Sequence, residues 1–174
     1  MENTNLISSK PNQLLVFVWG EARYALFLSA VKKVIQAVEI MELPEASRYI
    51  LGVINVQGDI LPVIDIRACF GLPESEIRLN THFILAKTGD HIVALVVDEV
   101  MGIHELKGSQ LVEVEHVAPG AKYIRGLAKL EDDLVLICDL DQFLTNDELE
   151  ALDDILTESE PESQPVPTEE REGD

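Results

Sequence analysis

A fifteen-residue pattern occurs twice in this chain in the same register, and it constrains the fold more than any other feature. The first copy covers residues 52–66 and the second covers residues 126–140, so the spacing is 126 − 52 = 74 positions with no gap. Each copy has apolar runs on both sides of an acidic turn, which is typical of two β-strands joined in a hairpin. A chain that repeats a two-strand unit is predicted to contain two related halves.

A further hairpin pattern precedes each copy. Residues 16–19 and 24–28 flank Gly20-Glu21, and residues 84–86 and 92–97 flank Gly89-Asp90. A Gly-acid pair suits the positive φ of a tight hairpin turn. The connecting stretches also match at a spacing of 66 positions, where Val31, Val34 and Ile35 align with Val97, Val100 and Met101. The predicted order is therefore hairpin, connector, hairpin, twice over, which is an all-β fold.

The formal net charge is −19, but it is concentrated near the C-terminus. Residues 146–174 contain twelve acids and one base, which is −11 of the total. Lys and Arg in the remaining residues are scattered, without the basic stripe that phosphate binding requires. We therefore expect no nucleic-acid partner.

The two ends of the chain differ in character from its body. Residues 1–12 are polar and predicted to be flexible, and the folded domain is predicted over residues 13–156. Thr145 and Glu148 form a capping-box pattern, followed by apolar residues at helical spacing, so a C-terminal helix is expected there. Residues 157–174 are rich in Pro, Glu, Ser and Thr and are predicted to be a disordered acidic tail.

No apolar run is long enough for a transmembrane span, and no secretion signal is recognisable, so a cytoplasmic location is expected. Cys69 and Cys138 are too few for a disulfide framework, and because each follows or ends an apolar strand they are predicted to be buried, reduced thiols. Pro62 cannot donate a ladder hydrogen bond, which predicts that its strand lies at an edge or is bulged.

Catalytic and metal-binding patterns are missing from the sequence. The four histidines (His82, His91, His104 and His116) show no metal-ligand spacing, and no serine stands in a nucleophile-elbow context. Asp65 and Asp139 each end an apolar strand, where an acid most often forms a turn or an ion pair, for Asp65 with Arg67. We expect no enzyme activity, no cofactor and no metal.

The first copy of the repeat carries a resemblance to a known family. Gly52, Asn55, Gly58, Pro62, Asp65 and Arg67, followed by Phe70-Gly71, stand in the register of the signature of CheW-like proteins, the coupling adaptors of bacterial chemosensory arrays. The resemblance extends from Leu14 to about Leu156. It implies two small five-stranded β-barrels that share an apolar core and have no catalytic activity.

The resemblance also implies two protein partners. One barrel would bind the regulatory domain of a CheA-type histidine kinase, and a groove between the barrels would receive the hairpin tip of a chemoreceptor. The kinase-binding residues carried over by position are Ile40, Gly52, Asn55, Gln57 and Gly58. The receptor-binding residues carried over are Leu28, Val31, Val34, Ala94 and Val100. Apolar strand residues are core more often than interface, so only those exposed as a patch count as a binding surface.

Two positions depart from the family pattern. The family usually has Arg where this chain has Gln57, and commonly Glu where it has Lys33. Lys33 and Gln57 can keep a hydrogen bond but not a bidentate ion pair, which indicates altered partner choice. The alternatives are an adaptor of a second chemosensory system controlling pili or surface motility, a regulatory domain detached from a kinase, and a small ligand-binding barrel protein or enzyme.

Overall fold

The computed structural model describes residues 12–43, 49–73, 76–108, 110–112 and 123–143, together with Glu150 and Asp154. Almost all of them belong to one compact unit, Met1–Phe143, and Leu144–Asp174 form a second unit. The flexible N-terminus, the C-terminal helix and the acidic tail fall almost entirely outside the described residues, so they stay predictions. No helix in the described part is long and apolar enough to cross a membrane.

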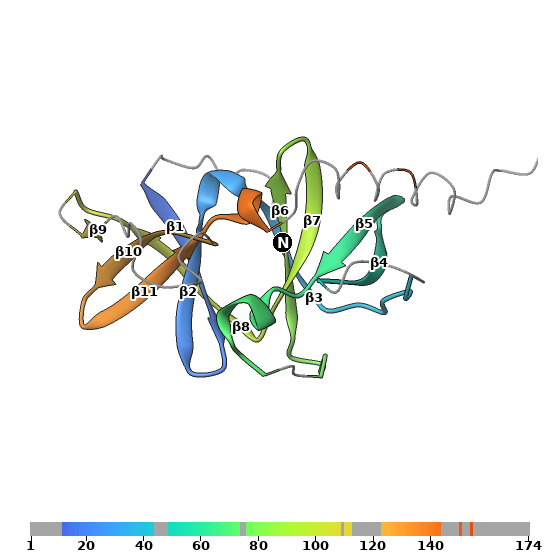
Figure 1. Ribbon diagram of the computed structural model, residues 1–174, viewed down its shortest axis with the longest axis horizontal. Coiled ribbons are helices and arrows are strands. Elements are labelled where there is room, and N and C mark those ends of the chain that lie inside the picture. Colours follow the sequence, from blue (N-terminus) through green and yellow to red (C-terminus); the bar gives the residue numbers. More distant parts are fainter. Residues whose placement is uncertain are drawn as a thin grey trace, which may run out of the picture. The chain divides into compact units, whose positions relative to one another are not determined.

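The described part of Met1–Phe143 is built from β-strands in two sheets (Figure 1), which confirms the all-β prediction. The strands are β1 (Gln13–Trp19), β2 (Ala22–Phe27), β3 (Val31–Gln36), β4 (Ile50–Val56), β5 (Asp59–Ile64), β6 (His82–Thr88), β7 (His91–Val97), β8 (Glu99–Glu105), β9 (Leu111–Val112), β10 (Ile124–Leu130) and β11 (Asp133–Cys138). Three short 3-10 helices are η1 (Leu28–Ala30), η2 (Arg67–Phe70) and η4 (Leu140–Gln142). One sheet has six strands rather than the expected five, because the two-residue β9 adds to its edge.

Each sheet takes strands from both halves of the chain. The six-stranded sheet has the order β8-β1-β2-β11-β10-β9, and the five-stranded sheet has the order β3-β6-β7-β5-β4. The hairpin β1–β2 of the first half therefore lies among the strands of the second half, and β6–β7 lies among those of the first (Figure 1). The two halves have exchanged their first hairpins.

The exchange is made through two equivalent parallel strand pairs. Ile137 of β11 pairs with Ala25 of β2, and Val63 of β5 pairs with Ala94 of β7. Val63 and Ile137 are 74 positions apart, and Ala25 and Ala94 are 69 apart, so both pairs join the same positions of the repeat. The predicted duplication of hairpins is thus present in the strand pairing itself.

The connecting strands follow a spacing different from the one expected. β3 pairs with β6 at Val31↔Ala86, and β8 pairs with β1 at Phe17↔Val100, so Val31 corresponds to Val100 at 100 − 31 = 69. The spacing of 66 expected from the sequence was wrong by three positions. Both stretches have apolar residues at intervals of three, so a shift by three still matches valine to valine.

A glycine occupies the start of each repeat because another backbone passes close by. A Cβ on Gly52 would lie 2.2 Å from the carbonyl oxygen of Met41, and Gly52 has φ +153°. A Cβ on the equivalent Gly126 would lie 3.3 Å from the carbonyl oxygen of Val112. Met41 and Val112 both lie in antiparallel contact beside the repeat strand, so these glycines allow a further chain segment to pair there.

Pro62 lies inside its sheet and not at an edge, because β5 has β7 on one side and β4 on the other. Its partner Val53 exchanges both backbone hydrogen bonds with Met41 and not with Pro62. The parallel pairing of β5 with β7 begins only at Val63. The missing N–H of Pro62 therefore falls where no ladder bond is made. The edge alternative of the prediction was wrong, and the irregularity in the β4–β5 pairing lies between Ile50 and Gly52, opposite Ile64 and Val63, so it is beside Pro62 and not at it.

The core has an apolar cluster for each sheet, with an aromatic group that includes Trp19. The Trp19 indole Nε1 donates to the carbonyl oxygen of Val96 at 2.7 Å, which bonds β1 of one sheet to β7 of the other. Trp19 also packs on Tyr24 and Phe70, with ring centroids 4.7 and 5.7 Å away. The two sheets are therefore packed against each other and not independent.

Candidate protein-binding surfaces

The predicted kinase-binding residues lie along one hairpin and the segment beside it. The β4–β5 turn is tight because Gln57 and Gly58 both have positive φ, at 54° and 95°, and the Gly58 N–H donates to Asn55 Oδ1 at 2.9 Å. Asn55, Gln57 and Gly58 are exposed. Gly52 is buried, and its missing Cβ leaves room for the Ile40 side chain, whose Cγ2 would otherwise lie 2.7 Å away. Ile40 is half-buried, so it flanks this surface.

The predicted receptor-binding residues divide by burial. Leu28 and Val31 are buried, and Ala94 has no exposed surface because β7 lies between β6 and β5 in the sheet. Val34 on β3 and Val100 on β8 are half-buried. A residue must be exposed to bind a partner, so only Val34 and Val100 are accessible, and the three buried residues belong to the core.

The predicted ion pair between Asp65 and Arg67 is confirmed and forms part of a larger network. Arg67 donates from Nε and Nη2 to the two carboxylate oxygens of Asp65, at 2.9 and 2.5 Å. Its Nη1 donates to Asp98 Oδ1 at 3.3 Å, and Asp98 Oδ2 accepts from the Gly20 N–H at 2.7 Å. Asp98 follows β7 and Gly20 lies in the β1–β2 turn, so the network links the two sheets. Sequence reasoning did not find Asp98, because it lies far from Arg67 along the chain.

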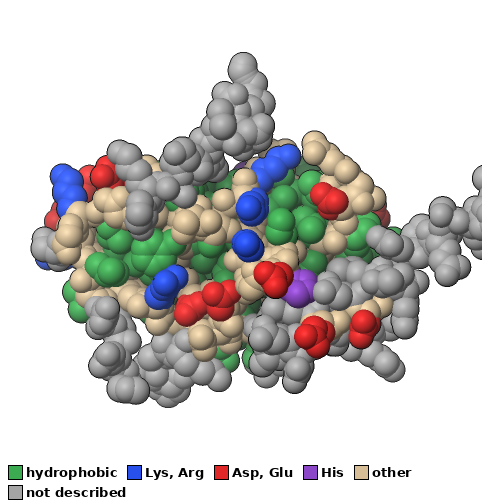
Figure 2. All heavy atoms as spheres, turned by 90° about the horizontal axis from the view of Figure 1, so that it is seen from above, with side chains coloured by type: hydrophobic (Ala, Val, Ile, Leu, Met, Phe, Trp, Pro, Cys, Tyr) green, Lys and Arg blue, Asp and Glu red, His purple; other side chains and the backbone are tan. Residues whose placement is uncertain are grey.

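Apolar side chains that sequence reasoning did not single out are exposed on the surface. Figure 2 shows hydrophobic side chains open on one face, with Lys and Arg side chains between them. The exposed large apolar residues in the described part of the chain are Val38, Met41, Ile77, Leu79, Met101, Ile103, Leu111, Val112 and Leu134. Several lie on the edge strands β8 and β9 or beside β4, where alternation alone does not distinguish an exposed face from a buried one.

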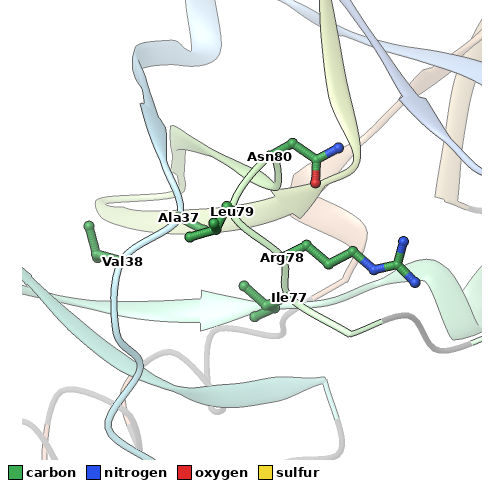
Figure 3. A pocket seen from close by; sticks show the side chains of 6 residues that line it. All are labelled: Ala37, Val38, Ile77, Arg78, Leu79 and Asn80. Carbon is green, nitrogen blue, oxygen red and sulfur yellow. The ribbon is translucent and has the colours of Figure 1, made fainter.

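One hollow of about 650 Å³ lies between the segment that follows β3 and the segment that precedes β6. Figure 3 shows Leu79 beside Ala37 in this hollow, with the Arg78 guanidinium directed away. Leu79 is 97% exposed, so the hollow is open. It lacks the converging polar groups of a small-molecule site.

In the described residues, no set of three or more His, Cys, Asp or Glu side chains comes together in a way that could hold a metal ion. Cys138 is buried, as predicted, whereas Cys69 is only half-buried, so the prediction of two buried thiols holds for Cys138 alone. Burial, followed by the neighbouring negative charge of Asp139, raises the pKa of the Cys138 thiol. A thiol held protonated in this way is a poor nucleophile.

Sequence and fold both match known proteins. The family model described as the CheW-like domain matches residues 13–148. The chain belongs to the CheW-like domain family. It is 31% identical over 140 residues to the chemotaxis protein CheW of Bacillus subtilis, a match covering 76% of this chain and 86% of that protein. It is 25% identical over 136 residues to the chemotaxis protein CheW of Helicobacter pylori, covering 78% and 82%.

A solved structure agrees with this assignment. The scaffolding protein TtCheW from Thermoanaerobacter tengcongensis superimposes with a TM-score of 0.72 at 27% identity, over 79% of this chain and 95% of that one. The chain is also 27% identical over 99 residues to protein FrzA of Myxococcus xanthus, covering 56% and 62%. As a CheW-like protein, the chain is a non-catalytic adaptor that couples chemoreceptors to a CheA-type histidine kinase.

Proposed function

We propose that the chain couples its two partners through separate surfaces in the cytoplasm. The β4–β5 turn would bind the regulatory domain of the kinase, and the accessible faces of β3 and β8 would bind the hairpin tip of a chemoreceptor. The observation that carries this proposal is the match of the CheW-like family model across residues 13–148. The exposure of the turn and the partial exposure of Val34 and Val100 support the choice of surfaces.

The kinase surface has a rigid centre. Asn55, Gln57 and Gly58 project at the end of the hairpin, and the Asn55–Gly58 hydrogen bond fixes the turn before any partner binds. A preformed loop loses less conformational entropy on association than a mobile one. Ile40 and Gly52 would contribute through the close packing that holds the adjacent segment in place.

The receptor surface is tested by introducing charge at accessible and buried positions. We expect Val34→Asp and Val100→Asp to keep the fold and to weaken binding to a receptor-tip fragment by at least about tenfold, or 1.4 kcal/mol. Val31→Asp places a charge in the core and is expected to unfold the domain. Leu134→Asp, at a side chain 61% exposed on β11, is the control and should change neither property. Circular dichroism and fragment binding by calorimetry together separate the outcomes. Unchanged receptor affinity in folded Val34→Asp and Val100→Asp variants would remove these faces from the proposal.

The kinase surface is tested at the turn. Gln57→Arg should change the free energy of unfolding by no more than about 0.5 kcal/mol, because the side chain is exposed. We expect it to shift the dissociation constant for the kinase regulatory domain by about tenfold. Glu131→Arg is a matched control, since Glu131 occupies the equivalent turn with the same φ of 54°. Combined with Lys33→Glu, the Gln57→Arg change should be non-additive by at least about 0.5 kcal/mol. Strict additivity with unaltered affinity in both single variants would show that the turn is not the docking surface.

An adaptor needs no nucleotide of its own. We expect no binding of ATP with magnesium in a calorimetric titration, and a dissociation constant below about 10 μM would contradict the proposal.

A second candidate function is the same coupling role in a chemosensory system with another output, which the departures at Lys33 and Gln57 favour. Identification of the kinase recovered with the chain from its native cells decides between the two.

A further inference from the structure

A pocket of about 450 Å³ lies between β3 and the β4–β5 hairpin. It is lined by Lys32, Lys33, Val56, Gln57, Asp59, Leu61, Leu85 and Ile92. Leu85 is buried, Leu61 and Ile92 are half-buried, and all three belong to the apolar cluster of the five-stranded sheet. Lys32, Gln57 and Asp59 are exposed. The pocket therefore joins an apolar wall to a polar, basic margin.

Two adjacent lysines reach the same pocket because β3 is irregular. In a regular strand, consecutive side chains point to opposite faces of the sheet. The pairing of β3 with β6 shifts between Val31 and Lys33, so Lys32 has no partner in the register. An extra residue of this kind re-aims the side chains around it. The irregularity allows two consecutive residues, Lys32 and Lys33, to line one pocket.

The second half of the chain has the same irregularity without the lysines. At the spacing of 69, Lys32 and Lys33 correspond to Met101 and Gly102 of β8, whose pairing with β1 shifts at the equivalent point. Gln57 corresponds to Glu131, and both have φ of 54°. The strand and the turn thus form with other residues at these positions. In the second half, therefore, the irregular strand and the turn are formed without positive charges at these positions.

The charge of the pocket is opposite to that of the whole chain. Lys32, Lys33 and Asp59 give a formal charge of 2 − 1 = +1, in a chain with net charge −19. Among the described residues, Arg23 and Arg67 form ion pairs with carboxylates, whereas Lys32 and Lys33 form none there. Two unpaired ammonium groups beside apolar surface bind a carboxylate more strongly than they would in open water.

We propose that this pocket receives the carboxylate of a glutamate or aspartate on a protein partner, while apolar residues beside that acid pack on Leu61 and Ile92. The pocket shares Gln57 with the turn assigned to kinase binding, so the inference rests on the proposed function. A small dicarboxylate would satisfy the lysines but leave the apolar wall uncovered. A protein segment with an acidic side chain between apolar ones would contact both the lysines and the apolar wall.

A peptide titration tests the pocket without either partner. The isotope-labelled full chain is titrated, by NMR, with acetyl-Leu-Glu-Leu-amide and with the matched acetyl-Leu-Gln-Leu-amide. We expect the acidic peptide to shift the amide signals of Lys32, Lys33 and Gln57 and to bind at least about tenfold more tightly than the amide peptide. Equal binding of the two peptides, or shifts confined to other regions, would overturn the proposal.

Variants and a small anion complete this test. The double variant Lys32→Gln, Lys33→Gln should lose the shifts, whereas the control Lys87→Gln, Lys129→Gln, at exposed lysines on β6 and β10, should keep them. Free glutarate should bind at least about fivefold more weakly than the acidic peptide, because it makes no apolar contact. Glutarate binding as tight as that of the acidic peptide would overturn the assignment to a protein partner.

Binding to the kinase separates this inference from the proposed function. The double variant should bind the kinase regulatory domain at least about tenfold more weakly than the unaltered chain, with a smaller difference at high salt. If the unaltered chain and the double variant bind equally well, the inference fails and the adaptor role stands. If the unaltered chain does not bind the kinase domain while the acidic peptide binds the pocket, the assigned kinase surface fails and the pocket stands.

Discussion

At the scale of single residues, Arg67 connects the start of η2 to the corner after β7. It is 3% exposed and forms charge-assisted hydrogen bonds with Asp65 and Asp98 at once. A buried guanidinium is tolerated only where carboxylates satisfy its donors, and their removal leaves charge without a partner. The position of η2 and the corner after β7 therefore depend on one side chain.

Arg67→Ala is expected to lower the free energy of unfolding by about 3 to 5 kcal/mol, because it leaves Asp65 partly buried without its partner. Arg67→Lys should recover only part of the loss, since an ammonium cannot form the bidentate pair. Urea denaturation measures both. Arg23→Ala is the control, because the Arg23–Asp133 pair is exposed and should contribute no more than about 1 kcal/mol. Equal losses for Arg23→Ala and Arg67→Ala would contradict this account.

The two repeat glycines give a matched pair of substitutions. Gly52→Ala should destabilise the domain by at least about 2 kcal/mol, because the new methyl group meets the Met41 carbonyl and the backbone has positive φ. Gly126→Ala should cost less, since its closest neighbour is the Leu111 side chain at 3.0 Å, which can move. Thermal denaturation of both variants tests the order. A larger loss for Gly126→Ala would be inconsistent with the geometry.

The buried side chains of Cys138 and Tyr24 should make the free energy of unfolding depend on pH in the alkaline range. Burial raises the pKa of Cys138 and of Tyr24. Each group therefore ionises more easily in the unfolded chain, and its contribution to stability is complete below the unfolded pKa and is lost as pH rises. We expect the free energy of unfolding to fall above about pH 9, where an unfolded thiol ionises. Cys138→Val should make this fall shallower, as measured by urea denaturation across pH. An unchanged slope would show that the thiol is not the responsible group.

At the scale of elements, the sequence predicted what local pattern determines. The hairpins, their turns and the register between the two motif copies were predicted because strand alternation and Gly-acid turns are local signals. The repeat extends to single hydrogen bonds: Asp65 N–H donates to the Tyr49 carbonyl, and Asp139 N–H donates to that of Tyr123, again 74 positions on. The connector spacing was wrong because valines at intervals of three allow several alignments.

The candidate site was predicted less completely, for a physical reason. Asn55, Gln57 and Gly58 were expected at the surface because a tight turn projects from its sheet, and they are exposed. Apolar strand residues were expected to be core more often than interface, but which of the five predicted receptor-binding residues would be buried was not predictable. Burial depends on strands that pair from distant parts of the chain, as β3 does with β6 and β5 does with β7. The Lys32–Lys33 pocket was also unpredictable, since it depends on a shift in strand pairing with no sequence signal of its own.

At the scale of the whole molecule, the exchange of hairpins makes each half dependent on the other. β1–β2 has its sheet partners in β8 and β11, and β6–β7 has its partners in β3 and β5. Neither half of the sequence contains a complete sheet. The duplication visible in the sequence is therefore not a boundary between two independent domains.

A chain divided between η2 and β6 tests this dependence. We expect fragments 1–76 and 77–174 to be unfolded when separate and to form the native fold when mixed, because each supplies strands to both sheets. Circular dichroism and amide exchange of the separate and mixed fragments measure this. Cooperative unfolding by either fragment alone would show that a half folds independently.

The pairing of β2 with β11 also has a consequence for synthesis on the ribosome. The hairpin at residues 13–27 emerges first, yet its parallel partner, Asp133–Cys138, is made more than a hundred residues later. At roughly 5 to 20 residues per second, the apolar face of this hairpin waits for several seconds without its neighbour. During that interval the nascent chain presents an unpaired strand edge, which is the kind of surface that chaperones cover.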